Sequence, residues 1–236
     1  MKTDYITTEQ PASNPGLRIS KLTALVNVAL AVTIAILSFW LGTRRSLGPG
    51  SESPEVGFAR DMMTHHAQAV DMATLLRDRT DDPALKQFAL DIMLTQQAQI
   101  GQMRGWLDTW GYPVASTGPA MAWMGMPTTG RMPGMATPEE LNQLRNLSGQ
   151  EADGLFLQLM IVHHRAGVAM GEAILSQTDR PEVRALAQSI VDAQAGEVAF
   201  MQELLQQKGF PPVPDEPEIN QDDAAPSGSG GHDMGN

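Results

Sequence analysis

The chain contains the same segment twice. Shifting the sequence by 98 residues aligns residues 58–113 with residues 156–211 without a gap, and 16 of the 56 aligned positions are identical. Both His-His pairs fall on identical positions, His65 with His163 and His66 with His164. A match at one fixed period indicates two copies of one supersecondary unit, so the fold must be built from a repeated element.

Each copy has the sequence signals of a helical hairpin. Ser53 precedes Pro54, which is the pattern of an N-cap followed by proline at the first helical position. Apolar residues then recur at helical spacing until Asp82 and Pro83, which end one helix and begin the next. Gly111 ends the second helix. Two amphipathic hairpins bury their apolar faces most simply against each other, so we predict an all-α four-helix bundle over residues 53–211.

The segments around the hairpins have their own signals. Residues 114–136 are rich in Gly, Pro and Met and predict a connecting loop, and Thr137 has the spacing of a capping box that begins a short helix. Ser148 has the same spacing and predicts a second capping box at the third helix of the bundle. Residues 212–236 are acidic and rich in Pro, Gly and Ser, which predicts a disordered tail.

An apolar segment lies near the N-terminus. Residues 22–42 carry no charge, and about 20 helical residues span a bilayer, so we predict a transmembrane helix after a short cytoplasmic tail at residues 1–21. A cleaved signal peptide is the alternative, although the run is long for one. Three basic residues before the span and two after it favour a single-pass protein of the cell membrane, with the bulk of the chain on the extracytoplasmic side.

The charge and the composition exclude several partners and sites. The net charge is -11, and residues 46–236 alone sum to -14, which argues against binding to nucleic acid. The absence of cysteine excludes disulfides and thiolate metal sites. No feature of the sequence identifies a protein partner.

Four of the five histidines lie in two clusters that also contain methionine. On a helix, Met62 is one turn before His65 and His66, and Met72 follows two turns after His65. Thioether and imidazole ligands together suit copper, especially Cu(I), and we predict one site in each repeat. The alternative is that the histidines are core residues held by hydrogen bonds, with Gln96 and Gln194 as candidate partners. The predicted ligands are Met62, His65, His66, Met72, Met160, His163, His164 and Met170.

The same spacing argues against an oxygen-activating enzyme. Di-iron bundles use a Glu-x-x-His motif, in which the carboxylate is a hard ligand. In this chain Met62 and Met160 take the place of that glutamate. We therefore expect no catalytic role and no cofactor other than copper.

The connecting loop holds five methionines within 15 residues, which are Met121, Met124, Met126, Met132 and Met135. A flexible loop of this kind could hold Cu(I) through two or three sulfurs, and the alternative is an apolar lid on the bundle. His232 and Met234 in the tail form a weaker candidate site.

The pattern Phe-x3-Met-x2-His-His-x5-Met at Phe58–Met72, with a second Met-x2-His-His at Met160, resembles domain-of-unknown-function family 305, which includes the CopM-like proteins. The resemblance covers about residues 53–210. It implies a ferritin-like four-helix bundle that is often exported or membrane-attached, with copper binding in some members. The expected function is sequestration or transfer of copper by a membrane-anchored extracytoplasmic protein, and the alternative is a structural or interaction module that binds no metal.

Overall fold

A computed structural model describes residues 21–46, 48–116 and 118–215. The chain divides into two compact units, Met1–Gly48 and Pro49–Asn236. Residues 1–20 and 216–236 lie outside the described residues, and with them lie the predicted cytoplasmic tail and the candidate site at His232 and Met234.

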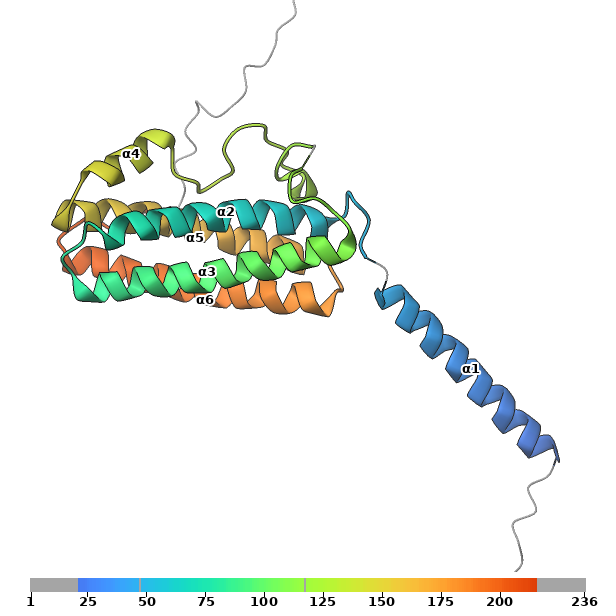
Figure 1. The fold of residues 1–236 in the computed structure, drawn as a ribbon. Helices are drawn as coiled ribbons and strands as arrows, with labels where there is room; N and C mark the ends of the chain where they lie inside the picture. The colour runs from blue at the N-terminus through green and yellow to red at the C-terminus, as the bar shows by residue number, and fades with distance from the viewer. Residues whose placement is uncertain (1–20, 47, 117, 216–236) are drawn as a thin grey trace, which may run out of the picture. The chain divides into compact units, whose positions relative to one another are not determined.

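The described part of the first unit forms one helix, α1, at Lys21–Ser46 (Figure 1). Its side chains from residue 22 to residue 40 are exposed, and Lys21–Trp40 has a mean hydropathy of 2.3. Among the described residues it is the one helix that is long and apolar enough to cross a membrane. A membrane anchor and a signal sequence both fit this finding.

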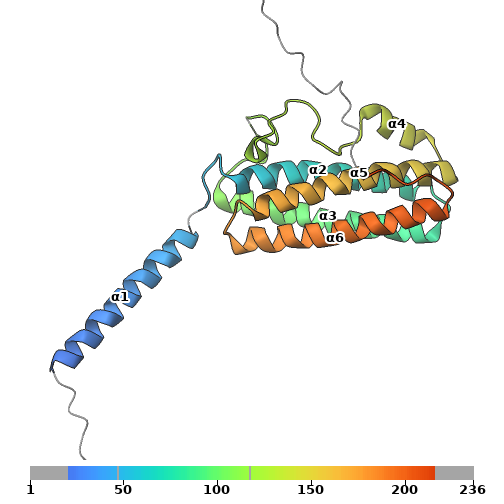
Figure 2. The same ribbon diagram turned by 180° about the vertical axis from the view of Figure 1, so that it is seen from behind.

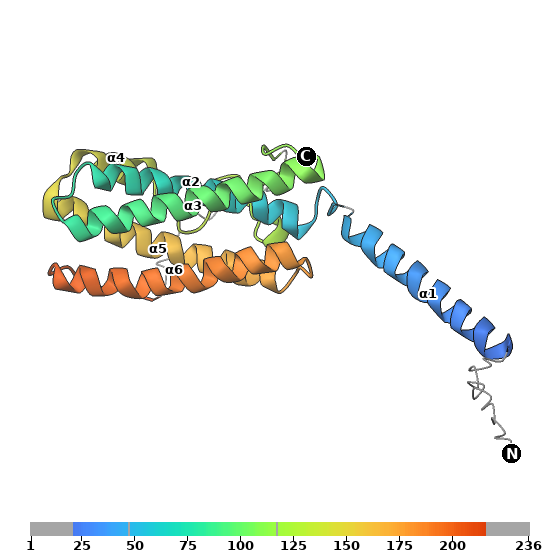
Figure 3. The ribbon, with the colours of Figure 1, turned by 60° about the horizontal axis from the view of Figure 1, so that its bottom comes forward.

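The second unit is the predicted four-helix bundle (Figure 1). The first hairpin is α2 (Pro54–Arg77) and α3 (Pro83–Trp110), and the second is α5 (Gly149–Leu175) and α6 (Pro181–Gln207). The two hairpins form two layers, which are separate in Figure 3. The connection between them includes the 3-10 turn η1 (Ala122–Met124) and the short helix α4 (Pro138–Asn146), and it lies over α2 and α5 (Figures 1 and 2).

Helices α2 and α5 run antiparallel at the contact between the hairpins. The Gly149 N–H at the start of α5 donates to the Arg79 carbonyl just beyond α2 (2.8 Å). Just beyond the other end of α5, the Thr178 hydroxyl donates to Glu55 in the first turn of α2 (2.7 Å). Because α5 begins at the end of the bundle where α3 also begins, a long crossover is required, as in ferritin-like bundles.

The local start and stop signals are mostly confirmed. The Ser53 and Asp82 side chains accept backbone N–H groups at the starts of α2 and α3, and Gly111 caps α3 with φ 79°. Thr137 forms the predicted capping box with Glu140. The capping box predicted at Ser148 is wrong, because its side chain makes no capping hydrogen bond.

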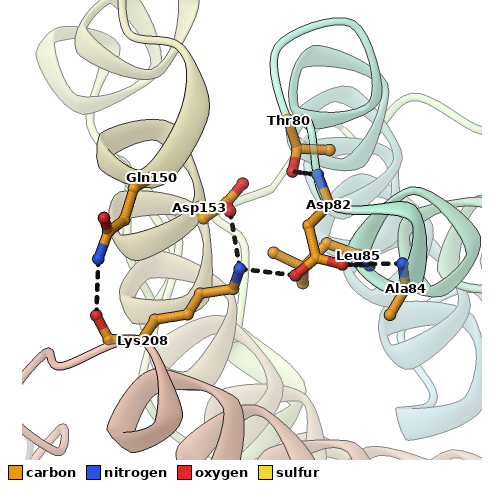
Figure 4. A network of polar contacts seen from close by, with 7 residues as sticks. All are labelled: Thr80, Asp82, Ala84, Leu85, Gln150, Asp153 and Lys208. Atoms are coloured by element: carbon orange, nitrogen blue, oxygen red, sulfur yellow. Dashed lines mark hydrogen bonds and ion pairs between the residues drawn. The ribbon is translucent and has the colours of Figure 1, made fainter.

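Polar contacts tie three helices together at one end of the bundle (Figure 4). The Lys208 ammonium donates to Asp82, the N-cap of α3 (2.6 Å), and to Asp153 in α5 (2.9 Å). The hydrogen bond from Lys208 holds the pKa of Asp82 below its usual value. Since Lys208 directly follows α6, the contacts fix the ends of both hairpins against each other.

The prediction of a disordered tail from residue 212 is wrong for its first residues. The Val213 N–H donates to the Gln202 side chain, which donates in turn to the Val213 carbonyl (3.1 and 2.6 Å). Arg165 on α5 donates to Asp215 (2.8 Å). The side chain of Val213 also packs against the core, which is a reason for these residues to be ordered.

The core consists of two apolar clusters. Cluster A contains the buried apolar side chains within residues 69–76 of α2 and within residues 152–161 of α5. Cluster B contains those within residues 56–63 of α2, together with Met170 and Ile174 of α5. Along both helices the His-His pairs lie between the two clusters.

Candidate metal centre

The four paired histidines of both repeats meet in one layer of the core. The rings of His65 and His163 are stacked, with centroids 3.7 Å apart and planes at 28°. The His164 ring lies 6.0 Å from that of His163, and all four side chains are fully buried. The antiparallel α2–α5 contact brings the first histidine of each pair together. The structure therefore groups the histidines differently from the predicted arrangement of one site in each repeat.

The four helix methionines also group across the repeats. Met62 and Met170 lie in cluster B, and Met72 and Met160 lie in cluster A. Ten residues of helix separate the backbones of Met62 and Met72 by about 15 Å, so these two sulfurs cannot bind one ion. Thioether sulfurs, which are candidate soft ligands, thus lie in the clusters on both sides of the histidine layer and come from both hairpins.

Hydrogen bonds fix three of the imidazole rings. The Nε2 atom of His66 lies 2.7 Å from Gln99 Oε1 on α3, and that of His164 lies 2.8 Å from Glu197 Oε2 on α6. The Nε2 atom of His163 lies 2.9 Å from the His65 carbonyl oxygen. All three partners are acceptors, so each Nε2 carries the proton in the neutral ring.

Gln96 and Gln194 do not make the hydrogen bonds considered in the sequence. Both side chains are buried, but Gln96 Oε1 and both polar atoms of Gln194 lack a partner. The partners of His66 and His164 are one turn further along the helices, at Gln99 and Glu197. These two residues occupy equivalent positions of the repeat, each 33 residues after its histidine. The sequence signal for these two partners is that they align with each other when the two repeats are superimposed.

Five ring nitrogens in this layer are buried without a hydrogen-bond partner. They are Nδ1 of His65, His66, His163 and His164, and Nε2 of His65. Leaving a buried polar atom unpaired costs about 1–3 kcal/mol, so such a concentration calls for a ligand. Lone pairs on neutral imidazole rings are ligands for soft and borderline metal ions.

Burial keeps the imidazoles of His65, His66 and His163 neutral. It lowers the pKa of His65 to about 3 and that of His66 to about 4, and it lowers the pKa of His163 well below the usual value. Repulsion between the neighbouring histidines adds to the effect. The carbonyl group of Pro133, which lies near the His65 ring without completing a hydrogen bond of ordinary geometry, raises the pKa of His65 in part. Neutral imidazole is the form that binds metal.

The methionine-rich loop is a packed cover and not an open strand. Met121 and Met132 are buried in cluster B, Met124 and Met135 are half-buried, and Met126 is exposed. This arrangement agrees with the alternative of an apolar lid for most of the loop.

Two polar residues of α2, which sequence reasoning did not single out as functional, attach the loop. Asp61 accepts the Met121 N–H (2.8 Å) and the Trp123 indole N–H (2.9 Å), and burial raises its pKa. Gln68 exchanges two hydrogen bonds with the backbone of Ala136. Between these anchors Gly134, with φ 76°, lies directly on α5 beside His163. The loop therefore closes the histidine layer from solvent on this side.

Whether a metal ion fits this layer depends on where the donor atoms of its side chains point. Among residues 21–46, 48–116 and 118–215, no three His, Asp or Glu side chains are placed to hold one ion together. Stacked rings do not direct their lone pairs to one point, so His65 and His163 would have to rotate to share an ion. The donor set itself, with neutral imidazoles between pairs of thioethers, fits copper.

Comparisons with known proteins agree with this fold. A DUF305 crystal structure from Streptomyces coelicolor is 42% identical, with a TM-score of 0.67, and the match covers 71% of this chain and all of that one. A DUF305 fragment from Deinococcus radiodurans is 37% identical (TM-score 0.57; 67% of this chain and 99% of that one). CopM in its Cu(II)-bound form is 29% identical (TM-score 0.53; 64% of this chain and 94% of that one).

A curated relative, Uncharacterized protein L153 of Acanthamoeba polyphaga mimivirus, is 39% identical over 51 residues. That match spans 22% of this chain and about a third of the relative, 34%. The family described as Domain of unknown function (DUF305) matches residues 55–205, which include all four helices of the bundle apart from a few terminal residues. The chain belongs to this family.

Proposed function

We propose that this protein binds copper ions through the buried histidine layer and the methionines beside it, and that it sequesters the metal or transfers it. The observation that carries the proposal is the set of five buried ring nitrogens without partners, together with the lowered pKa values of His65, His66 and His163, which keep these three rings neutral. The thioethers of Met62 and Met170 on one side, and of Met72 and Met160 on the other, extend the donor set. The likeness to a Cu(II)-bound CopM structure supports the choice of metal.

The proposed role is binding without turnover. Methionine replaces the glutamate of a Glu-x-x-His motif in both repeats, so the hard ligands of oxygen-activating sites are lacking at these positions. We also propose that α1 anchors the chain in the cell membrane and that the acidic bundle faces the extracytoplasmic side.

The test is an anaerobic Cu(I) titration of the full chain in detergent against a competing chelator. The double variant His65→Leu/His163→Leu removes two rings but keeps the layer apolar, and His232→Ala, the fifth histidine, is the matched control. We expect the double variant to lose tight binding and the control to retain it. Binding that survives in the double variant but disappears in Met124→Leu/Met126→Leu/Met135→Leu would place the ion in the loop instead.

A second candidate is a structural module that binds no metal. The complete burial of the four histidines and four helix methionines favours it, because packing alone accounts for buried methionine. Under this candidate no protein in the titration binds Cu(I), and the histidine variants change only the thermal unfolding midpoint.

A further inference from the structure

The two hairpins hold their second histidines with different side chains. His66 is bound by an amide, Gln99, and His164 is bound by a carboxylate, Glu197, at the equivalent position of the repeat. The distances are 2.7 and 2.8 Å, so the geometry is nearly the same while the charge differs by one unit. Gln99 is buried and Glu197 is half-buried, with 26% of its side chain exposed.

Both contacts determine which ring nitrogen is free. A carbonyl or carboxylate oxygen can only accept a hydrogen bond, so it places the proton on Nε2 of the neutral ring. The Nδ1 atoms of His66 and His164 then carry lone pairs, and both of them are buried without a partner. An acceptor behind a metal-binding histidine fixes its tautomer and orientation in this way.

The carboxylate adds an effect that the amide lacks. It makes the imidazole it binds a more basic ligand, and its negative charge attracts a divalent ion twice as strongly as a monovalent ion at the same distance. The basic residue next to His164 does not neutralise this charge through a described contact, because Arg165 donates instead to Asp215 and to the carbonyls of Val213 and Pro214.

We propose that Gln99 and Glu197 are positioning residues that set His66 and His164 as Nδ1 donors, and that Glu197 makes its half of the histidine layer prefer Cu(II) to Cu(I). The preference for one oxidation state rests on the proposed copper binding, whereas the choice of tautomer does not. The two repeats thus supply equivalent histidines, His66 and His164, whose hydrogen-bond partners differ by one unit of charge.

The decisive variant is Glu197→Gln, which copies the amide of the first repeat and keeps an acceptor for Nε2–H. Glu203→Gln is the matched control, because Glu203 lies exposed on the same helix and the change removes the same charge. Cu(I) and Cu(II) affinities are measured on the full chain in detergent by chelator competition, Cu(I) under anaerobic conditions. The tautomers are read separately from nitrogen-15 spectra of metal-free protein labelled at histidine.

We expect Glu197→Gln to weaken Cu(II) binding about 10- to 100-fold, the usual range for partners behind a ligand, and to change Cu(I) binding much less. Glu203→Gln should change neither affinity. In the metal-free wild type and in Glu197→Gln, His164 should show a protonated Nε2 and an unprotonated Nδ1, and Glu197→Ala should lose this preference.

Three results would overturn the inference, and they can be told apart. A His164 ring protonated on Nδ1 in the metal-free wild type would refute the positioning role whatever the copper data show. Equal losses of Cu(I) and Cu(II) affinity in Glu197→Gln would refute the charge preference alone. A wild-type chain that binds neither ion would refute the proposed function together with the charge preference, while the spectra would still decide the tautomer.

Discussion

The buried histidines should make the metal-free bundle sensitive to mild acid. The pKa values of His65, His66 and His163 are lowered in the folded chain, to about 3 for His65 and about 4 for His66, because burial disfavours the charged ring. In the unfolded chain each histidine titrates near pH ~6.5. Below that pH the unfolded chain takes up protons that the folded chain cannot accept. The free energy of unfolding therefore falls as the pH falls from 6.5 towards 4, and it is constant above about pH 7.

The size of the effect follows from the number of rings. Each histidine contributes about 1.4 kcal/mol per pH unit within this window. Lowering the pH from 7.5 to 5.5 crosses about one such unit, so three rings should cost roughly 4 kcal/mol. A domain of ordinary stability has about 5–15 kcal/mol in total. The lowered pKa of Asp82 acts only at lower pH, below the usual range of a carboxyl, and the raised pKa of Asp61 acts in the opposite direction.

The assay is urea unfolding of residues 49–236, which form a compact unit containing both apolar clusters. Chelator-treated protein is unfolded at pH 7.5, 6.5 and 5.5, and the helical circular dichroism signal is followed. In His65→Leu/His163→Leu one ring of the three remains, so the loss between pH 7.5 and 5.5 should shrink to about 1.4 kcal/mol. A wild-type loss below about 1 kcal/mol would refute the reasoning, because it would mean that these rings accept protons in the folded state.

Three further predictions concern the loop and the end of the bundle. Asp61→Ala removes two hydrogen bonds that hold the loop, so it should speed amide hydrogen exchange at Met121 and lower the free energy of unfolding by about 1–3 kcal/mol. Unchanged exchange at Met121 would show that Asp61 does not anchor the loop. Gly134→Ala places a Cβ 2.4 Å from that of Ala166 at a positive φ, and should lower the thermal unfolding midpoint by several degrees, whereas Gly130→Ala, where the nearest atom is 3.6 Å away, should not. Lys208→Met should lower the free energy of unfolding, measured in urea, by about 2 kcal/mol. This is less than the roughly 3–5 kcal/mol expected for a fully buried pair, because Asp82 is partly exposed. An unchanged free energy would show that the contacts in Figure 4 contribute nothing to stability.

The bundle was predictable because its signals are local and occur twice. Ser53, Asp82 and Gly111 mark helix ends through backbone chemistry that needs no tertiary contact, and the structure confirms them. The failure at Ser148 has a cause that lies partly outside the local sequence. The helix there starts at Gly149 with φ 57°, and the N–H of Gly149 donates to the carbonyl of Arg79, a partner distant in sequence.

The grouping of the candidate ligands was not predictable from spacing on one helix. Spacing placed Met62, His65 and Met72 on one face, but it did not show that the facing residues come from the second repeat. That information depends on the antiparallel contact of α2 with α5, and so on the long crossover. Likewise, the acceptors for His66 and His164 depend on the register between the helices of each hairpin, which shifts the partner from Gln96 to Gln99 and from Gln194 to Glu197.

His65 and His163 hold equivalent positions of the two repeats and stack on each other, so the contact between the hairpins resembles an isologous dimer interface inside one chain. Such an interface is built around a two-fold axis. In a true dimer of identical hairpins, each residue would appear on both sides of the axis, and a carboxylate behind one histidine would require a second carboxylate behind the other. Covalent fusion removes this constraint. It is what allows Glu197 to occupy the position equivalent to Gln99, so that a carboxylate lies behind His164 while an amide lies behind His66.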